Sequence, residues 1–177
     1  EADDIIASAA AQATAMNLSC EIFSADRDLY QTLTDSVRVV RIDGSTFGPL
    51  DLHEKYGCSP TQYRELAAMR GESADCIDGV PRVGEKTAVK VVSAFSSFES
   101  AVAPDSGLES VVPAKVAALL REHADVVRRN ISVATLRVDL PVPLHGCTLP
   151  LQGEQVFGSL RRAELPAAAS AMKNACC

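Results

Sequence analysis

The chain has 177 residues, 47% of them hydrophobic, and a formal net charge of −6, which fits one globular domain with an appendage. No apolar run is long enough to cross a membrane, so we expect no membrane partner. The six cysteines form no C-x-x-C pair, which argues against a zinc site and predicts free thiols in a reducing intracellular compartment. The negative charge by itself does not indicate a nucleic-acid binder.

The first fifty residues alternate between helical and extended patterns. We predict an Ala- and Ile-rich helix over residues 3–15, a short buried strand over 20–24, a helix over 26–33 and a second strand over 37–42, ended by Asp43 and Gly44. This alternation is typical of a parallel sheet covered by helices. Because Glu1 has no cap before it, we expect residues 1–50 to be the later part of a larger α/β core.

From Leu50 onward the pattern is helical. We predict a helix over 50–57 that stops at Gly57, and a second over 59–71 that starts with Ser59 and Pro60. An amphipathic helix is predicted over 114–129, an extended stretch over 131–144 and a C-terminal helix over 161–177. We therefore assign residues 51–145 to a helical region and 146–177 to a C-terminal helix and tail.

Acidic side chains stand at three places that the predicted fold can bring together. One group begins the first predicted helix, a second follows the first strand directly, and a third ends a later helix. The two acids of the third group stand at an i, i+3 spacing, which lets both side chains face the same way. In order, the groups are Glu1, Asp3 and Asp4; Asp26 and Asp28; Glu72 and Asp75. Stabilisation by the helix dipole, about 0.3–1 kcal/mol per acid, explains one or two of them.

A shared pocket of carboxylates without His or Cys suits Mg²⁺ or Mn²⁺, and such a cation offsets the repulsion between the acids. The alternative is that they are ordinary surface acids. If the seven acids named above are counted as neutralised by metal, the chain keeps 16 acidic residues and 17 basic ones. The acidic balance of the chain therefore does not exclude a nucleic-acid partner.

The stretch GVPRVGEKTAVKVV (residues 79–92) carries a glycine at each end of a short loop, between one predicted helix and another that starts near Glu85. We expect both glycines to adopt backbone angles that a Cβ would forbid. Such a loop presents bare amides and a helix N-terminus, which bind phosphate oxygens. The predicted DNA contacts are Gly79, Arg82, Val83, Gly84, Lys86, Thr87 and Lys90. The alternative is a turn used for packing or for a protein partner, and in either case we place Val80, Val83, Ala88, Val91 and Val92 in the core.

Six stretches occur in an order that resembles a known family: EADDII, SADRDLYQTL, VRVVRIDG, HEKYGCSPTQYRELAAMRGESADC, IDGVPRVGEKTAVKVV and REHADVVRRNISVATLRVDLPV. Residues 1–145 resemble the second half of the 5′-nuclease (flap endonuclease) family, and within it the 5′–3′ exonuclease domains of bacterial-type DNA polymerase I. The resemblance implies an α/β fold, with a partial PIN-like (Rossmann-like) parallel sheet followed by a helical region that contains the helix-hairpin-helix.

The resemblance also implies a function. It implies structure-specific hydrolysis of DNA phosphodiesters at 5′ ends and flaps, or of RNA in RNA/DNA hybrids, with two divalent ions, Mg²⁺ or Mn²⁺, and a K⁺ ion at the hairpin. It assigns the acids from Glu1 to Asp75 named above to the metal site. Glu72 stands where the family usually has Asp, and Cys76 stands where it usually has Asn.

Two other functions stay open at this point. The resemblance implies further chain before the EADD motif. This chain is then either part of a nuclease, which its missing N-terminal half or a larger assembly completes, or a catalytically incomplete member of the family. The incomplete member would bind nucleic acid or act as a scaffold. A binder of phosphorylated small molecules needs a glycine-rich loop directly after a strand. The glycines here are predicted to lie between helices, which disfavours that class.

Overall fold

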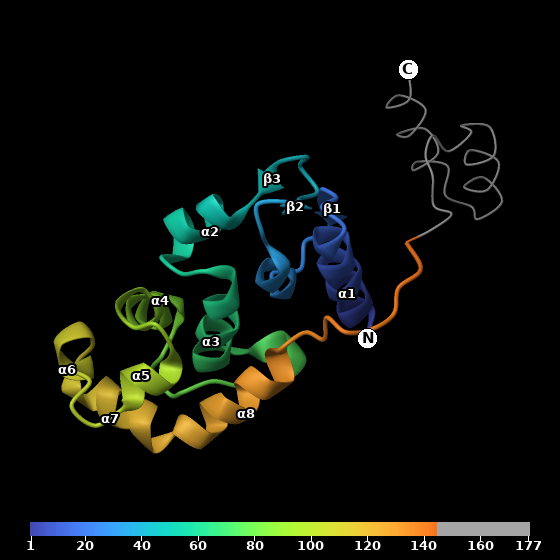
Figure 1. Cartoon of the computed structure of the whole chain (residues 1–177). Helices are drawn as coiled ribbons and strands as arrows, with labels where there is room; N and C mark the ends of the chain where they lie inside the picture. Colours follow the sequence, from blue (N-terminus) through green and yellow to red (C-terminus); the bar gives the residue numbers. More distant parts are fainter. Residues whose placement is uncertain (145–177) are drawn as a thin grey trace, which may run out of the picture. The chain divides into compact units, whose positions relative to one another are not determined.

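A small mixed sheet forms the N-terminal part of the molecule. The computed structural model describes residues 1–144, of which Glu1–Val142 form one unit. Strands β1 (Cys20–Phe23) and β2 (Val37–Val40) pair in parallel, and β3 (Thr46–Phe47) adds to β2 in antiparallel orientation. Helix α1 (Ala2–Ala15) packs beside this sheet (Figure 1). The predicted helix over 26–33 is wrong, since the segment forms only the short 3-10 helix η1 (Asp28–Thr32).

The remainder is mainly helical, as the sequence predicts. The helices are α2 (Pro49–Tyr56), α3 (Pro60–Arg70), α4 (Glu85–Ala94), α5 (Phe98–Val102), α6 (Leu108–Val111), α7 (Ala114–Glu122) and α8 (Ala124–Ala134) (Figure 1). The predicted end of α2 and the predicted start of α3 are confirmed. Gly57 ends α2 in a left-handed conformation with φ 62°. The backbone amide of Ser59 donates to Gln62 Oε1 at 3.0 Å at the start of α3.

Three predictions for the helical region are wrong. A hairpin of two very short strands, β4 (Gly71–Glu72) and β5 (Ile77–Asp78), interrupts it, with the 3-10 turn η2 (Ser73–Asp75) between them. The predicted helix over 114–129 is two helices, because His123 leaves helical geometry at φ −98° and ψ 18°. Residues 131–134, predicted to be extended, continue α8. The predicted C-terminal helix over 161–177 lies outside the described residues, and the division of the chain at residue 50 stays a prediction.

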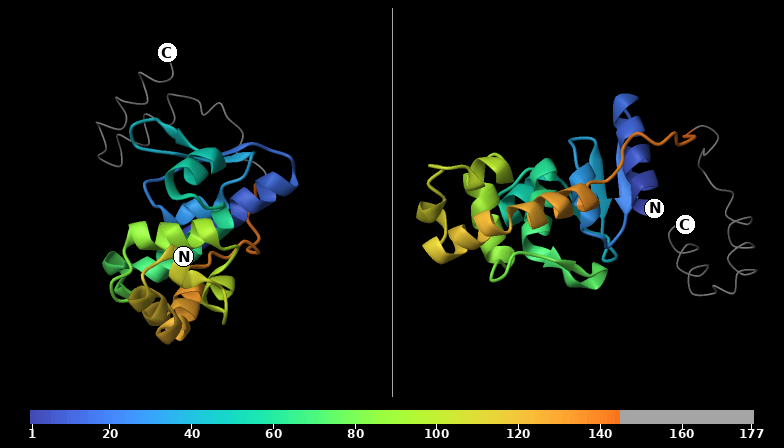
Figure 2. Two further views of the ribbon diagram at one scale, coloured as in Figure 1. Left: turned by 90° about the vertical axis from the view of Figure 1, so that its left-hand side faces the viewer. Right: turned by 90° about the horizontal axis from the view of Figure 1, so that it is seen from below.

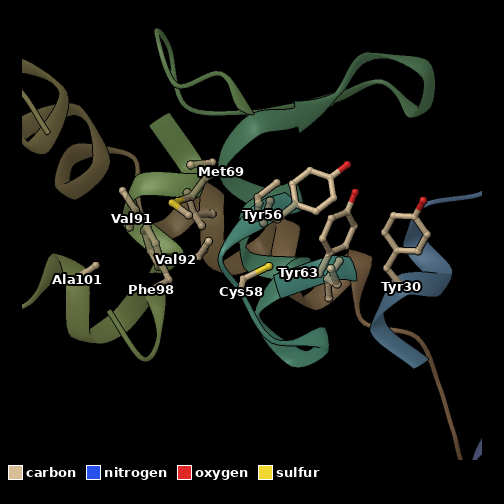
Figure 3. Packing of buried hydrophobic residues seen from close by; sticks show 14 of the residues in the cluster. Tyr30, Tyr56, Cys58, Tyr63, Met69, Val91, Val92, Phe98 and Ala101 are labelled. Carbon is tan, nitrogen blue, oxygen red and sulfur yellow. The ribbon is translucent and has the colours of Figure 1, made fainter. Parts of the chain in front are cut away.

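Helix α3 is the centre of the core. Its Tyr63 ring lies edge-on to Tyr30 of η1 at 5.3 Å and to Tyr56 of α2 at 5.4 Å between centroids (Figure 3). Tyr30 stacks in turn on Phe47 of β3 at 4.5 Å. This row of aromatic side chains joins the sheet to the helices, so burial of one continuous apolar cluster holds the unit together.

The segment after α8 returns to the start of the chain. Figure 2 shows α8 running from the helical end of the unit toward α1. The backbone amide of Arg137 donates to Asp4 Oδ1 at 2.8 Å, and the amide of Leu140 donates to Ser8 Oγ at 3.1 Å. Ser8 Oγ donates to the Arg137 carbonyl at 3.2 Å and Gln12 to the Leu140 carbonyl at 2.8 Å. We call residues 135–142 the return segment, and these bonds fix it along α1.

Two simpler expectations concern cysteines and membranes. Among residues 1–144, Cys20, Cys58 and Cys76 are free thiols, as predicted. In the same range no helix combines the length and apolarity that a membrane crossing requires.

Candidate metal centre and nucleic-acid interface

Six of the seven predicted metal-binding acids surround one cavity of about 390 Å³. They come from the start of α1, the loop after β1, strand β4 and the turn η2: Glu1, Asp3, Asp26, Asp28, Glu72 and Asp75. The carboxyl end of β1 therefore opens onto the cavity, as expected for a ligand site in an α/β protein. We call this space the acidic cavity.

Local hydrogen bonds fix the two acids that follow β1. The amide of Asp26 donates to Ser24 Oγ at 3.0 Å, and the amide of Asp28 donates to Asp26 Oδ1 at 2.9 Å. This Asx-type turn brings the chain from the strand into η1 without a longer helix. The side chain of Asp26 thus supplies an acceptor for an amide at the start of η1, which has no acceptor inside the turn.

Two acids of the cavity, Asp3 and Asp28, have a raised pKa. Burial and then the charges of Asp26, Glu72 and Asp75 raise the pKa of Asp28 to about 6. Burial, followed by the charge of Asp26 and then those of its neighbours on α1, raises the pKa of Asp3. Acids from three separate segments thus share one electrostatic environment, and their ionised forms repel one another.

The acidic cavity suits a hard cation by its chemistry, although its acids do not converge on one point. Its polar lining consists of carboxylates and one amide, Asn130, with no His or Cys, and this donor set fits Mg²⁺ or Mn²⁺. Within residues 1–144, no three His, Cys, Asp or Glu side chains are placed to hold a metal ion together. Mutual repulsion is a sufficient reason for acids to stand apart.

Asp4 is the exception among the predicted metal-binding acids. It does not line the acidic cavity, and its Oδ1 instead accepts the hydrogen bond from the backbone of Arg137. We therefore assign Asp4 to holding the return segment and remove it from the proposed ligand set. The sequence prediction included it because it stands among the clustered acids and in the EADD motif of the resemblance.

Arg70, which the sequence prediction missed, joins the acidic cavity to the predicted DNA-binding loop. Its side chain is only 16% exposed and forms ion pairs with Glu72 of β4 and with Glu85 at the start of α4. Arg27, between the two acids after β1, pairs with the same Glu85 at 3.6 Å. These contacts show that the start of α4 lies close to two segments that supply cavity acids.

Asn130 is a second residue that the sequence prediction missed. It is 3% exposed, lines the acidic cavity and donates to the carbonyl oxygens of Ala68 at 3.2 Å and Asp78 at 2.8 Å. It thereby ties α8 to α3 and β5 below the acids. A polar residue at a buried helical position was the available signal, but only the fold shows what it bonds.

We predict that Asn130→Ala lowers the free energy of unfolding by about 2 kcal/mol, because it removes the donor that bonds the carbonyl oxygens of Ala68 and Asp78. Chemical denaturation measures the loss. Its neighbour Arg129 is exposed, so Arg129→Ala is the matched control and should change the same quantity by less than about 0.5 kcal/mol. Equal losses in the two variants would contradict a structural role for the Asn130 amide.

The predicted DNA-binding loop, residues 79–84, differs from its prediction in three ways. It follows strand β5 rather than a helix. Neither Gly79 nor Gly84 has a positive φ, and the residue in the left-handed region is Arg82, with φ 67°. The Val83 side chain is 4% exposed and packs in the core instead of lying on the surface of the loop. The five apolar residues predicted for the core here, from Val80 to Val92, are all buried.

The rest of the loop keeps an exposed, cationic surface. The amide of Val80 donates to the Met69 carbonyl at 2.9 Å and that of Val83 to the Val80 carbonyl at 3.0 Å, which fixes a tight turn before α4. Arg82, Gly84, Lys86 and Lys90 are exposed and Thr87 is half-buried. The first amides of α4 have no partner within the helix, so this surface is suited to a phosphate group.

Comparisons with known proteins identify the family. Residues 1–57 match the 5′-3′ exonuclease N-terminal resolvase-like domain, and residues 58–156 match the 5′-3′ exonuclease C-terminal SAM fold. An α/β part followed by a helical part is thus the class of fold, as predicted. The chain belongs to the 5′-3′ exonuclease family.

Individual relatives agree with this assignment. The thermostable DNA polymerase I of Thermus thermophilus is 35% identical over 142 residues, which cover 80% of this chain and 17% of that protein. T5 5′-exonuclease with bound zinc ions has a TM-score of 0.64 at 21% identity, covering 76% of this chain and 49% of that one. The T5 flap endonuclease in a complex with DNA and metal ions gives 0.63 at 21% identity over the same shares. This chain therefore spans under a fifth of the polymerase and about half of the phage protein.

Proposed function

We propose that this chain is part of a structure-specific 5′-nuclease that hydrolyses DNA phosphodiesters at 5′ ends or flaps with two divalent metal ions, Mg²⁺ or Mn²⁺. The observation that carries the proposal is the acidic cavity, which six carboxylates from separate segments line and which Arg70 connects to a loop suited to phosphate. The T5 relative that was solved with DNA and metal ions supports the same pairing of substrate and cofactor.

Each part of the site has a distinct task in this proposal. The cavity carboxylates hold the cations, which when bound polarise a phosphate and lower the pKa of a water molecule. Residues 79–84 and the start of α4 hold the backbone of a DNA duplex through amides, Lys86 and Lys90, without reading bases. Arg70 holds Glu72 and Glu85 in their relative positions. The duplex is thus held at a set distance from the carboxylates, which is catalysis by positioning.

Three finer points belong to the same proposal. A K⁺ ion binds at the carbonyl groups of the loop, RNA in RNA/DNA hybrids is a second substrate, and the protein works in a reducing intracellular compartment.

A second candidate function is a nucleic-acid-binding or scaffold module without catalysis. One observation favours it: among residues 1–144, no three acidic, His or Cys side chains are placed to hold a metal ion. The two candidates share the binding loop and differ in the chemistry at the cavity. An assay on a labelled 5′-flap DNA with Mn²⁺ separates them, since the nuclease cleaves it and loses activity in EDTA. Binding without cleavage would support the module.

The binding loop makes a separate prediction. Lys86→Glu should weaken binding to duplex DNA about tenfold at low salt and reduce the salt dependence of the affinity by about one unit of slope, because one phosphate contact is lost. Fluorescence anisotropy measures both. Lys115 is an exposed lysine on α7, so Lys115→Glu changes the net charge equally and should leave the slope unchanged. Equal affinities for wild type and Lys86→Glu would remove the loop from the interface.

A further inference from the structure

A second cavity, of about 440 Å³, carries cationic side chains from three different segments. Arg27 comes from the loop after β1, Arg41 from the turn after β2 and Lys55 from α2. None of the three belongs to the predicted site. We call this cavity the basic cleft.

Two of the three cations are held in place by aromatic rings. The Arg41 guanidinium carbon lies 4.2 Å from the centre of the Phe47 ring, and Lys55 Nζ lies 4.9 Å from the centre of the Tyr56 ring. Both rings are buried, and Figure 3 shows Tyr56 within the core. Cation–π contact of this kind restricts the side chain and leaves the charge available. The basic cleft is therefore partly organised before any ligand arrives.

The cleft has an excess of positive charge that its own acids do not offset. Its one acid, Asp43, accepts hydrogen bonds from the amide and the hydroxyl of Ser45 at 2.9 Å and 2.6 Å, which engage it within its own turn. Within residues 1–144, Arg41 and Lys55 form no ion pair with a carboxylate. Arg27 pairs with Glu85 at 3.6 Å, with the two side chains 53% and 43% exposed, and such an exposed pair is weak.

The position of the cleft indicates its ligand. A neighbouring cavity is lined by four acids of the proposed metal site and also by Ala25 and Arg27, and these last two residues line the basic cleft as well. A polyanion whose phosphate lies at the metal site can therefore pass Arg27 and continue to Arg41 and Lys55. In a chain of net charge −6, this local excess of cations is not a consequence of overall basicity.

We propose that the basic cleft binds the phosphodiester backbone of the nucleic-acid strand where it extends beyond the acidic cavity, at a site separate from residues 79–84. The proposal rests on the proposed function, and it adds a second phosphate contact surface on the sheet side of the acids. Because cations recognise phosphate rather than bases, the cleft contributes affinity and strand position without sequence preference.

Charge reversal in the cleft tests the proposal. Arg41→Glu/Lys55→Glu should weaken binding to a 5′-flap DNA at least tenfold and reduce the salt slope by about two units, because two phosphate contacts are lost. Anisotropy titrations in Ca²⁺ at several salt concentrations measure both. Lys115→Glu/Arg129→Glu makes the same change in net charge at two exposed positions outside the cleft and should keep the wild-type slope. Equal losses in the two double variants, or a wild-type slope in the cleft variant, would overturn the proposal.

Two further arms separate the possible failures. Arg41→Gln/Lys55→Gln avoids introduced repulsion and should show an intermediate loss of affinity with an unchanged circular dichroism spectrum. A wild-type affinity in this folded variant would count against the cleft.

If wild type binds DNA and Lys86→Glu weakens that binding while the cleft variants bind normally, the cleft proposal fails and the proposed function stands. If wild type does not bind DNA, the proposed function itself fails. Thermal stabilisation by inorganic phosphate in wild type but not in the cleft variant, with unchanged DNA affinity, would assign the cleft to a free phosphate compound and overturn the strand assignment.

Discussion

Without divalent cations, wild type will lose stability relative to Asp28→Asn as the pH rises from 4 to 7. Burial and the charges of Asp26, Glu72 and Asp75 raise the pKa of Asp28 from 3.8 to about 6. Between these two values the native state binds more protons than the unfolded state, so the free energy of unfolding falls as the pH rises and is fully reduced above pH 6. After allowance for the partly solvated position of Asp28, we expect a difference of about 1–2 kcal/mol at pH 7.

Divalent cations will restore the unfolding free energy that wild type loses when the acids of the cavity are charged. Mg²⁺ or Mn²⁺ at about one hundred times its dissociation constant should add about 2.7 kcal/mol to the unfolding free energy of wild type, and EDTA should reverse the gain. Asp28→Asn should gain clearly less, because it has lost a ligand. Glu54 is exposed on α2, so Glu54→Gln removes one acid outside the cavity and should respond as wild type does. Thermal unfolding at pH 7 measures all three proteins, and equal gains in wild type and Asp28→Asn would contradict a cation site at this cavity.

The acids show how far sequence alone can locate such a site. Asp26 and Asp28 follow a strand, and this placement was sufficient to predict that they face a shared cavity. Asp3 and Asp4 are consecutive on a helix and therefore point about 100° apart, so charge alone could not assign both to one cavity. The partner of Asp4 is the backbone of Arg137, which lies more than a hundred positions later in the chain. Only the fold decides which acid faces the cavity.

Local signals predicted the helices that have caps and missed features that depend on distant contacts. Gly57 and Ser59 mark their helix ends within a few residues, and the structure keeps both. The hairpin of β4 and β5 has two residues in each strand, too few for an alternating pattern. Asn130 bonds residues 62 and 52 positions away, so its role below the acids has no local signature.

The two glycines of the loop before α4, Gly79 and Gly84, look alike in the sequence but have different structural roles. A Cβ on Gly79 would lie 2.3 Å from the carbonyl carbon and oxygen of Arg70 and 2.5 Å from the amide nitrogen of Gly71. These are backbone atoms of the end of α3 and the start of β4, and they cannot move aside cheaply. A Cβ on Gly84 would meet nothing within 4 Å. Gly79 is thus required by close packing of two backbone segments, whereas Gly84 leaves an open surface at the start of α4.

These two positions should therefore give opposite results. Gly79→Ala should lower the free energy of unfolding by about 3 kcal/mol or more, because the β4–β5 hairpin must shift to admit the Cβ. Gly84→Ala should change it by less than about 1 kcal/mol, since a weaker helix cap is offset by reduced entropy of the unfolded chain. If the loop binds phosphate through its amides, Gly84→Ala should still weaken duplex binding severalfold, because the new methyl group stands where a backbone must approach closely.

Denaturation and anisotropy on the same two variants separate fold from function in this loop. A stable Gly84→Ala protein with wild-type affinity would show that DNA does not approach the backbone there, whatever Lys86→Glu does. A Gly79→Ala protein as stable as wild type would show that α3 and β5 can move apart at this contact. That result would also weaken the assignment of Arg70 as the residue that holds the cavity and the loop in position, because Arg70 carries the backbone atoms that Gly79 approaches.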